Sequence, residues 1–200
     1  MYLSVFILGF ISMTAQAVFL REILATFLGS ELIIGAALFF WLLWTSLGSG
    51  ILGRLSGRVF DAERSFHQLL PWYGLLCYAG FFLAGSVPYI ARLTPGEHVP
   101  LDLQFIAAAF AFMPFNILGG YLFTLAVRML RSETSPSAGR AYMVEAYGSA
   151  AAGIAVSLVL VATFTNSAIA LTCPLLTVGT SAAHWIQHRR TTNALSLIHV

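Results

Sequence analysis

Glu145 is the side chain in this sequence with the clearest capacity for chemistry. It lies five residues after Arg140 and opens a long apolar run. A carboxylate beside hydrocarbon is costly, so such a group is paired or takes part in function. We expect Glu145 to lie at a membrane interface and to pair with Arg54, Arg58 or Arg140. The alternative is a site that couples the protein to a proton or a cation.

A second group of polar side chains lies at the end of the first apolar run. Gln16, Arg21 and Glu22 are found there, either as interfacial anchors with a local ion pair or as the lining of an outward-facing cavity. Asn116 lies in the fourth apolar run, close to a proline and two glycines, and interrupted helices of this kind carry binding sites in transporters. A protein that houses a small substrate is expected to have one polar cavity lined by Gln16, Arg21, Asn116 and Glu145.

Two histidines complete the candidate residues. His67 and His184 lie near matching ends of the third and sixth apolar runs, so they could approach each other. We expect both to be interfacial side chains, and the alternative is ligation of haem b by the pair. The sequence contains no HExxH, P-loop or nucleophile-elbow motif. We therefore predict no catalytic residue, no metal site and no other cofactor.

The composition requires a membrane to position these residues. Hydrophobic residues make up 58% of the chain and charged residues 9%, and the mean hydropathy is +0.84. Soluble domains carry about 25% charged residues, so this chain has too few to cover itself in water, and the lipid bilayer is its expected solvent. The net charge of +2 gives no reason to expect a nucleic-acid partner.

Six apolar stretches are long enough to span a bilayer, which requires about 20 residues each. We predict an all-α integral membrane protein with a six-helix bundle over residues 1–190 and a short, frayed tail over 191–200. The predicted helices cover residues 2–20, 32–53, 69–90, 103–129, 141–164 and 168–186.

The arginines predict the orientation of the bundle. Eight lie in alternate connections or the tail, against Arg21 and Arg92 on the other side. Because cytoplasmic loops carry the excess of positive charge, both termini are expected in the cytoplasm, with the protein in a bacterial-type inner membrane. The eight are Arg54, Arg58, Arg64, Arg128, Arg131, Arg140, Arg189 and Arg190.

Small residues spaced by three or four positions predict where the helices touch, because they let backbones approach closely in lipid. One such face is expected on the second helix and another on the fifth. The first comprises Ser46, Ser49, Gly50, Gly53 and Gly57, and the second comprises Ala146, Ser149, Ala150 and Gly153.

Three segments resemble the membrane region of the spermidine synthase-like membrane proteins. The stretch AQAVFLREILATFLGSELIIGAALFFWLLWTSLGSGILGR resembles that family's first two helices, MPFNILGGYLFTLAVR its fourth, and GRAYMVEAYGSAAAG the start of its fifth. The likeness covers about residues 8–185, and the matching positions are Pro114, Gly119, Gly139, Tyr142, Glu145 and Gly148. It implies a multi-helix membrane region of the kind that precedes a cytosolic aminopropyltransferase-type domain.

The sequence departs from that family at several points. Gln16 stands where many relatives carry glutamate, and Phe123 where many carry proline. The glycine-rich nucleotide loop and the carboxylates of the catalytic domain are missing, so aminopropyl transfer is not assigned to these residues. A weaker likeness, carried by six helices and the connection GILGRLSGR, is to half of a major-facilitator transporter.

We weigh three hypotheses for function. The first is a non-catalytic membrane module that houses or moves a small substrate such as a polyamine, as a half-transporter acting as a dimer or with a separate soluble enzyme. The second is a subunit or scaffold of a larger membrane complex, buried against other membrane proteins. The third is the N-terminal membrane half of a spermidine synthase-like enzyme.

Overall fold

A computed structural model describes residues 1–27, 31–94, 97–131 and 137–198, with backbone alone at residues 137 and 190–198. Every regular element in these ranges is helical, and six helical segments are long and apolar enough to cross a membrane. The predicted all-α class is therefore confirmed, together with six helices that are long and apolar enough to span a membrane. The elements are α1 (Tyr2–Thr26), α2 (Glu31–Leu47), η1 (Gly48–Leu52), α3 (Gly53–Ser56), α4 (Ala62–Ile90), α5 (Leu101–Met129), α6 (Ser137–Ala155), η2 (Val156–Leu160), α7 (Val161–Thr163) and α8 (Asn166–Ile198).

The helices extend beyond the predicted apolar stretches. The α4 helix begins at Ala62 rather than at residue 69, because the Asp61 carboxylate accepts a hydrogen bond of 2.9 Å from the backbone N–H of Arg64 and caps the helix. The α8 helix runs on to Ile198, through most of the segment predicted as a tail. Hydropathy marks the part of a helix that lies in hydrocarbon, whereas capping sets where the helix begins.

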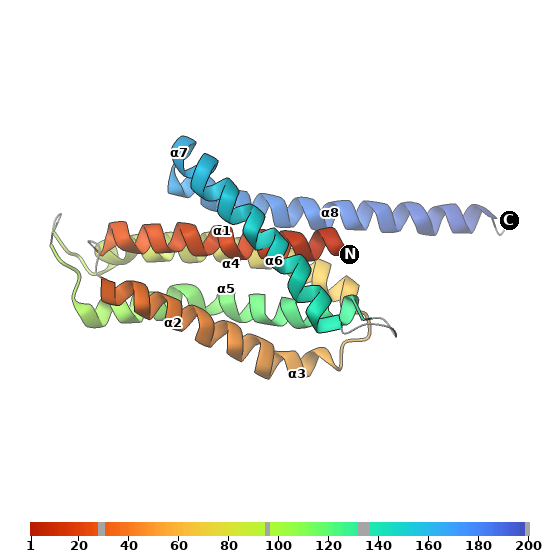
Figure 1. Ribbon diagram of the computed structural model, residues 1–200, viewed down its shortest axis with the longest axis horizontal. Helices are drawn as coiled ribbons and strands as arrows, with labels where there is room; N and C mark the ends of the chain where they lie inside the picture. The colour runs from red at the N-terminus through yellow and green to blue at the C-terminus, as the bar shows by residue number, and fades with distance from the viewer. Residues whose placement is uncertain (28–30, 95–96, 132–136, 199–200) are drawn as a thin grey trace.

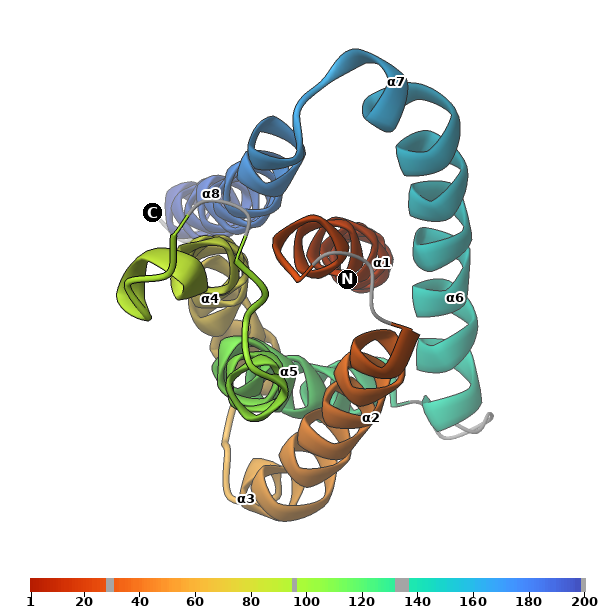
Figure 2. The ribbon, with the colours of Figure 1, turned by 90° about the vertical axis from the view of Figure 1, so that its left-hand side faces the viewer.

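The α1 helix lies at the centre of the arrangement, with the other spans around it (Figures 1 and 2). It contacts α6 most extensively, and it also contacts α4 and α8. The fifth span, formed by α6, η2 and α7, stands to one side and packs almost entirely on α1. Half of the most apolar window of α1 is buried, against 17% of that of the fifth span.

The crossing of α1 and α6 is a backbone-to-backbone contact. A Cβ atom at Gly9 would overlap the carbonyl oxygen of Glu145, and one at Gly148 would overlap the carbonyl oxygen of Phe6. The hydroxyl of Ser149 also donates a 3.1 Å hydrogen bond to the Gly9 carbonyl. Glycine is needed at these two positions because the helices approach too closely for a side chain.

The second close crossing joins the second span to α5. A Cβ atom at Gly48 would overlap the backbone of Ile117, and one at Gly120 would overlap the carbonyl oxygen of Thr45. Gly50, by contrast, faces open space, and Ser46 and Gly57 are exposed. The predicted contact face of this helix is therefore wrong at those three positions.

Aromatic side chains fill the space beside α1. Phe115 is fully buried, and its ring stacks on Tyr73 with centroids 4.3 Å apart. Phe19 contacts Phe112 edge to face at 4.7 Å, and Trp41 lies 5.6 Å from Phe115. These rings join α1, α2, α4 and α5 in one apolar cluster.

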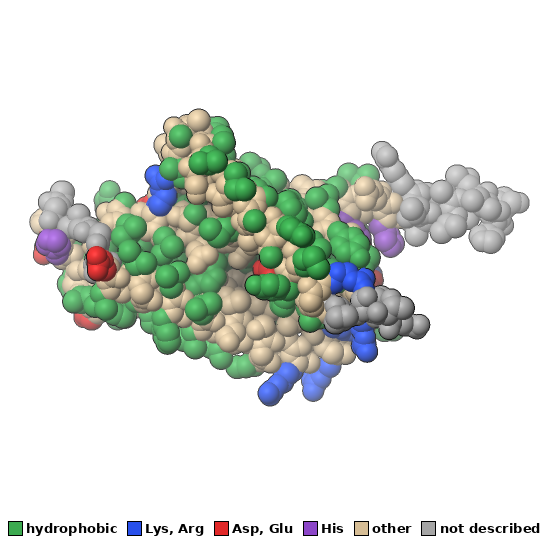
Figure 3. All heavy atoms as spheres, viewed as in Figure 1, with side chains coloured by type: hydrophobic (Ala, Val, Ile, Leu, Met, Phe, Trp, Pro, Cys, Tyr) green, Lys and Arg blue, Asp and Glu red, His purple; other side chains and the backbone are tan. Residues whose placement is uncertain are grey.

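Both termini lie at the same end of the bundle, as an even number of spans requires (Figure 1). Most of the basic side chains visible on the face in Figure 3 are also at that end. One arginine ties two elements there, because Nη2 of Arg128 on α5 donates a 3.0 Å hydrogen bond to the carbonyl of Val59, between α3 and α4. At the opposite end, two hydrogen bonds from Thr94 hold the pKa of the exposed Glu97 carboxyl below its ordinary value.

Candidate functional site

A cavity of about 230 Å³ lies inside the bundle, between the central helix and the second, third, fourth and fifth spans. The face of the molecule between α2 and α6 is hollowed in Figure 3, with acidic atoms at the hollow. The cavity wall mixes apolar side chains with hydroxyl, amide and carboxyl groups. It is lined by Leu8, Ser12, Thr45, Ser49, Tyr73, Asn116, Gly119, Gly120, Phe123, Tyr142 and Glu145.

The α1–α6 crossing places Glu145 at this cavity. The Glu145 carbonyl lies over Gly9, so this turn of α6 is held against α1, and the carboxylate side chain lines the space beyond. No ion pair of Glu145 is found among the described residues. A carboxylate held among apolar helices can bind a proton or a cation.

Asn116 supplies the second polar group of the cavity. It is 2% exposed, and its side-chain Nδ2 has no hydrogen-bond partner among the described residues. The carboxamide of Asn116 carries both donors and an acceptor, so it can hydrogen-bond to acceptor or donor atoms of a ligand. Its position on α5 is four residues before Gly120, where α5 meets the second span through backbone atoms.

The structure brings together some of the predicted site residues and separates others. Asn116 and Glu145 line the same cavity, whereas Gln16 and Arg21 are not among its lining residues. Glu22 accepts a 3.3 Å hydrogen bond from Nδ2 of Asn166 and lines a different pocket.

The predicted arginine partners of Glu145 lie towards the end of the bundle that carries both termini. Arg54 and Arg58 are exposed, and Arg140 is half-buried near the start of α6. None of the three lines the cavity.

Sequence reasoning did not assign four polar residues to the cavity. Ser12, Thr45, Ser49 and Tyr73 line it together with Glu145. Ser12 carries a usable signal, because the interval from Gly9 to Ser12 is close to one helical turn and so places both on one face of α1. Tyr73 carries none, because its contact with this space depends on how α4 packs.

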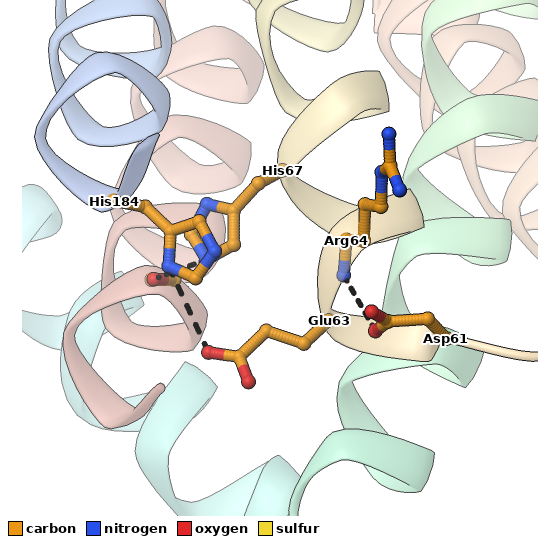
Figure 4. A network of polar contacts seen from close by, with 6 residues as sticks. Asp61, Glu63, Arg64, His67 and His184 are labelled. Carbon is orange, nitrogen blue, oxygen red and sulfur yellow. Dashed lines mark hydrogen bonds and ion pairs between the residues drawn. The ribbon is translucent and has the colours of Figure 1, made fainter. Parts of the chain in front are cut away.

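A second cluster lies at the end of the bundle that carries the termini (Figure 4). The imidazole rings of His67 on α4 and His184 on α8 are stacked, with centroids 3.7 Å apart and an angle of 8° between the planes. Nε2 of His67 is 3.3 Å from the Ser4 hydroxyl, and Nδ1 of His184 is 3.7 Å from Oε1 of Glu63. The two histidines are thus brought together, as their positions suggested.

The contact between these rings bears on the haem alternative. A bis-histidine haem has one ring on each face of its macrocycle, and rings stacked at 3.7 Å leave no space between them for it. Haem ligation by His67 and His184 is therefore not carried into the proposed function.

No protein-family model, curated protein or solved structure matches this chain. The likeness to spermidine synthase-like membrane proteins accordingly stays a prediction from the sequence.

Proposed function

We propose that this protein is a non-catalytic membrane module that binds a small amine in its central cavity. The observation that carries the proposal is a carboxylate, Glu145, lining a space of about 230 Å³ with Asn116 and two tyrosines. A cavity of about 150 Å³ admits benzene, so this one is large enough for a small organic molecule.

The chemistry of the wall favours a cation over a neutral molecule or an anion. The Glu145 carboxylate supplies a negative charge, and none of the lining residues is an arginine or a histidine. Tyr142 adds an aromatic ring, which attracts an ammonium group through its face, whereas one face of the Tyr73 ring is covered by Phe115. The Asn116 side-chain oxygen can accept a hydrogen bond from the same group.

The proposed orientation places the terminal end of the bundle in the cytoplasm of a bacterial-type inner membrane. Support comes from the eight arginines assigned to that side against two, since cytoplasmic loops carry the positive excess. A separately encoded soluble enzyme that makes or consumes the amine would meet the protein at this end.

A subunit of a larger membrane complex is the second candidate, and the fifth span supports it. This span packs almost entirely on α1 and leaves large apolar side chains exposed. Apart from Tyr142, which lines the cavity, they include Met143, Tyr147, Ile154, Leu158 and Val159. Purification in mild detergent followed by mass spectrometry would give stoichiometric partner chains if this candidate holds, and a monomer or homodimer if it does not.

Replacement of Glu145 by glutamine tests the amine site. We expect the purified protein to bind 1,4-diaminobutane in isothermal titration calorimetry and to bind the neutral 1,4-butanediol much more weakly. Hydrogen bonds to charged groups contribute about 1.5–3 kcal/mol, so Glu145→Gln is expected to weaken diamine binding by about 10- to 150-fold.

The matched control is Glu22→Gln, which removes a carboxylate from the pocket at the other end of α1. It is expected to leave the affinity unchanged. Equal binding of the diamine and the diol, or an unchanged affinity in a folded Glu145→Gln protein, would contradict the proposed function.

A further inference from the structure

We propose that Glu63, His67 and His184 form a binding site for a divalent transition-metal ion of the zinc class. One ligand atom from each residue lies within 4.8 Å of the others. The site is separate from the central cavity, shares no residue with it, and does not depend on the proposed function.

The donor set determines the class of ion. Two imidazole nitrogens and one carboxylate oxygen suit Zn²⁺ and its neighbours in the first transition row rather than Ca²⁺ or Mg²⁺, which prefer oxygen ligands. Three protein ligands also leave a fourth position of a tetrahedral ion for water or another donor. Asp61 and His188 line the adjoining pocket of about 300 Å³.

The cluster is not accounted for as packing alone. His67 is 1% exposed, and its Nδ1 has no hydrogen-bond partner among the described residues. A buried ring nitrogen without a partner is costly. Nδ1 of His184 lies 3.7 Å from Oε1 of Glu63, which is an ion-pair distance but longer than a hydrogen bond.

Local rotations would bring the ligands to coordination distance. Metal–ligand bonds of about 2.0–2.2 Å place the ligand atoms of a tetrahedral site about 3.3 Å apart. The stacked rings must also tilt, because the lone pairs of parallel imidazoles do not converge. His184 and Glu63 have side chains that are 21% and 39% exposed, so these two have the freedom to move towards the buried His67.

The charges around the cluster are of both signs: the carboxylates of Glu63 and Asp61 favour a cation, whereas the amino group of Met1 acts on His67 as a like charge and Arg64 lines the adjoining pocket. Glu63 precedes His67 by four residues, and His188 follows His184 by four, so each helix presents its pair on one face. Arg64 is the cation nearest in sequence, and its side chain extends away from the cluster in Figure 4, with the guanidinium 5.7 Å from the centre of the Trp185 ring. An ion bound here would link α4 to α8 at the terminal end of the bundle.

Metal titration of the protein, purified without a polyhistidine tag and stripped with a chelator, tests the site. We expect one equivalent of Co²⁺ to bind and to give the visible absorption of tetrahedral cobalt, and we expect Zn²⁺ to displace it. Glu63→Gln and His184→Ala, both at partly exposed positions, are each expected to weaken Zn²⁺ binding by at least tenfold. Their folding is checked by thermal unfolding in the same detergent.

The control is His98→Ala, which removes an exposed histidine from the connection between α4 and α5. It is expected to bind Zn²⁺ like the unaltered protein. The inference is overturned if the unaltered protein binds neither ion. It is equally overturned if folded Glu63→Gln and His184→Ala proteins bind Zn²⁺ as tightly as the His98→Ala protein.

Discussion

Replacing Gly148 by alanine is expected to lower the stability of the folded bundle by about 3 kcal/mol, at the upper end of the usual cost of overpacking. The added Cβ would overlap the Phe6 carbonyl oxygen. It would also lie 2.9 Å from the Phe6 carbonyl carbon and 3.0 Å from the Phe10 backbone nitrogen. A backbone cannot change rotamer, so α6 must move away from α1. Equilibrium unfolding in mixed detergent and SDS micelles measures the difference.

Gly153→Ala is the matched control on the same helix. Its nearest neighbour would be the flexible end of Met13, at 3.8 Å, so no helix has to move. Both substitutions carry the same gain in helix propensity, about 1 kcal/mol, which cancels in the comparison. Equal stabilities of the two variants would show that α1 and α6 do not cross at Gly148.

Phe115→Ala is expected to destabilise the bundle by about 3 kcal/mol, the lower end of the range for removal of a buried aromatic ring. The ring is 0% exposed and stacks on Tyr73 at 4.3 Å, and its loss leaves a cavity that rigid helices close only in part. We place the value low because an unfolded helix in lipid still keeps its apolar side chains out of water. Thermal unfolding followed by circular dichroism measures the loss.

The comparison variant is Phe110→Ala on the same helix, where the ring is 57% exposed. Its removal leaves no enclosed cavity, so it is expected to change stability by less than about 1 kcal/mol. Similar losses in both variants would contradict the burial of Phe115 between α5 and its neighbours.

Hydropathy alone predicted the six spans, because a run of about 20 apolar residues has few stable conformations other than a membrane helix. The contact face of the second span was not predictable in the same way. Its π-helical turn, Gly48–Leu52, adds a residue within the helix and changes the spacing of the residues that follow. The face was already misplaced before that turn, because the exposed Ser46 was selected and Gly48, which makes the contact, was not.

The candidate cavity was predictable for two residues and not for the others. Asn116 and Glu145 were identified because polar groups within apolar runs are rare. Arg21 lies nine positions beyond Ser12, about 180° around the helix at 3.6 residues per turn, and it is exposed while Ser12 lines the cavity. Which side of α1 faces the cavity depends on packing with α6, and the sequence marks that side by Gly9 and Ser12, about one helical turn apart, rather than by Arg21.

The close pairing of α1 with α6 has a consequence during synthesis. Gly9 and Ser149, which are joined by a hydrogen bond, are separated by 140 residues of chain. At a translation rate of about 5–20 residues per second, Ser149 is synthesised roughly 7–28 s after Gly9. Over that interval the most central helix of the finished protein has its glycine face turned to lipid or to an insertion factor. This helix precedes the other five spans along the sequence, yet it is enclosed only after α6 and α8 have been made.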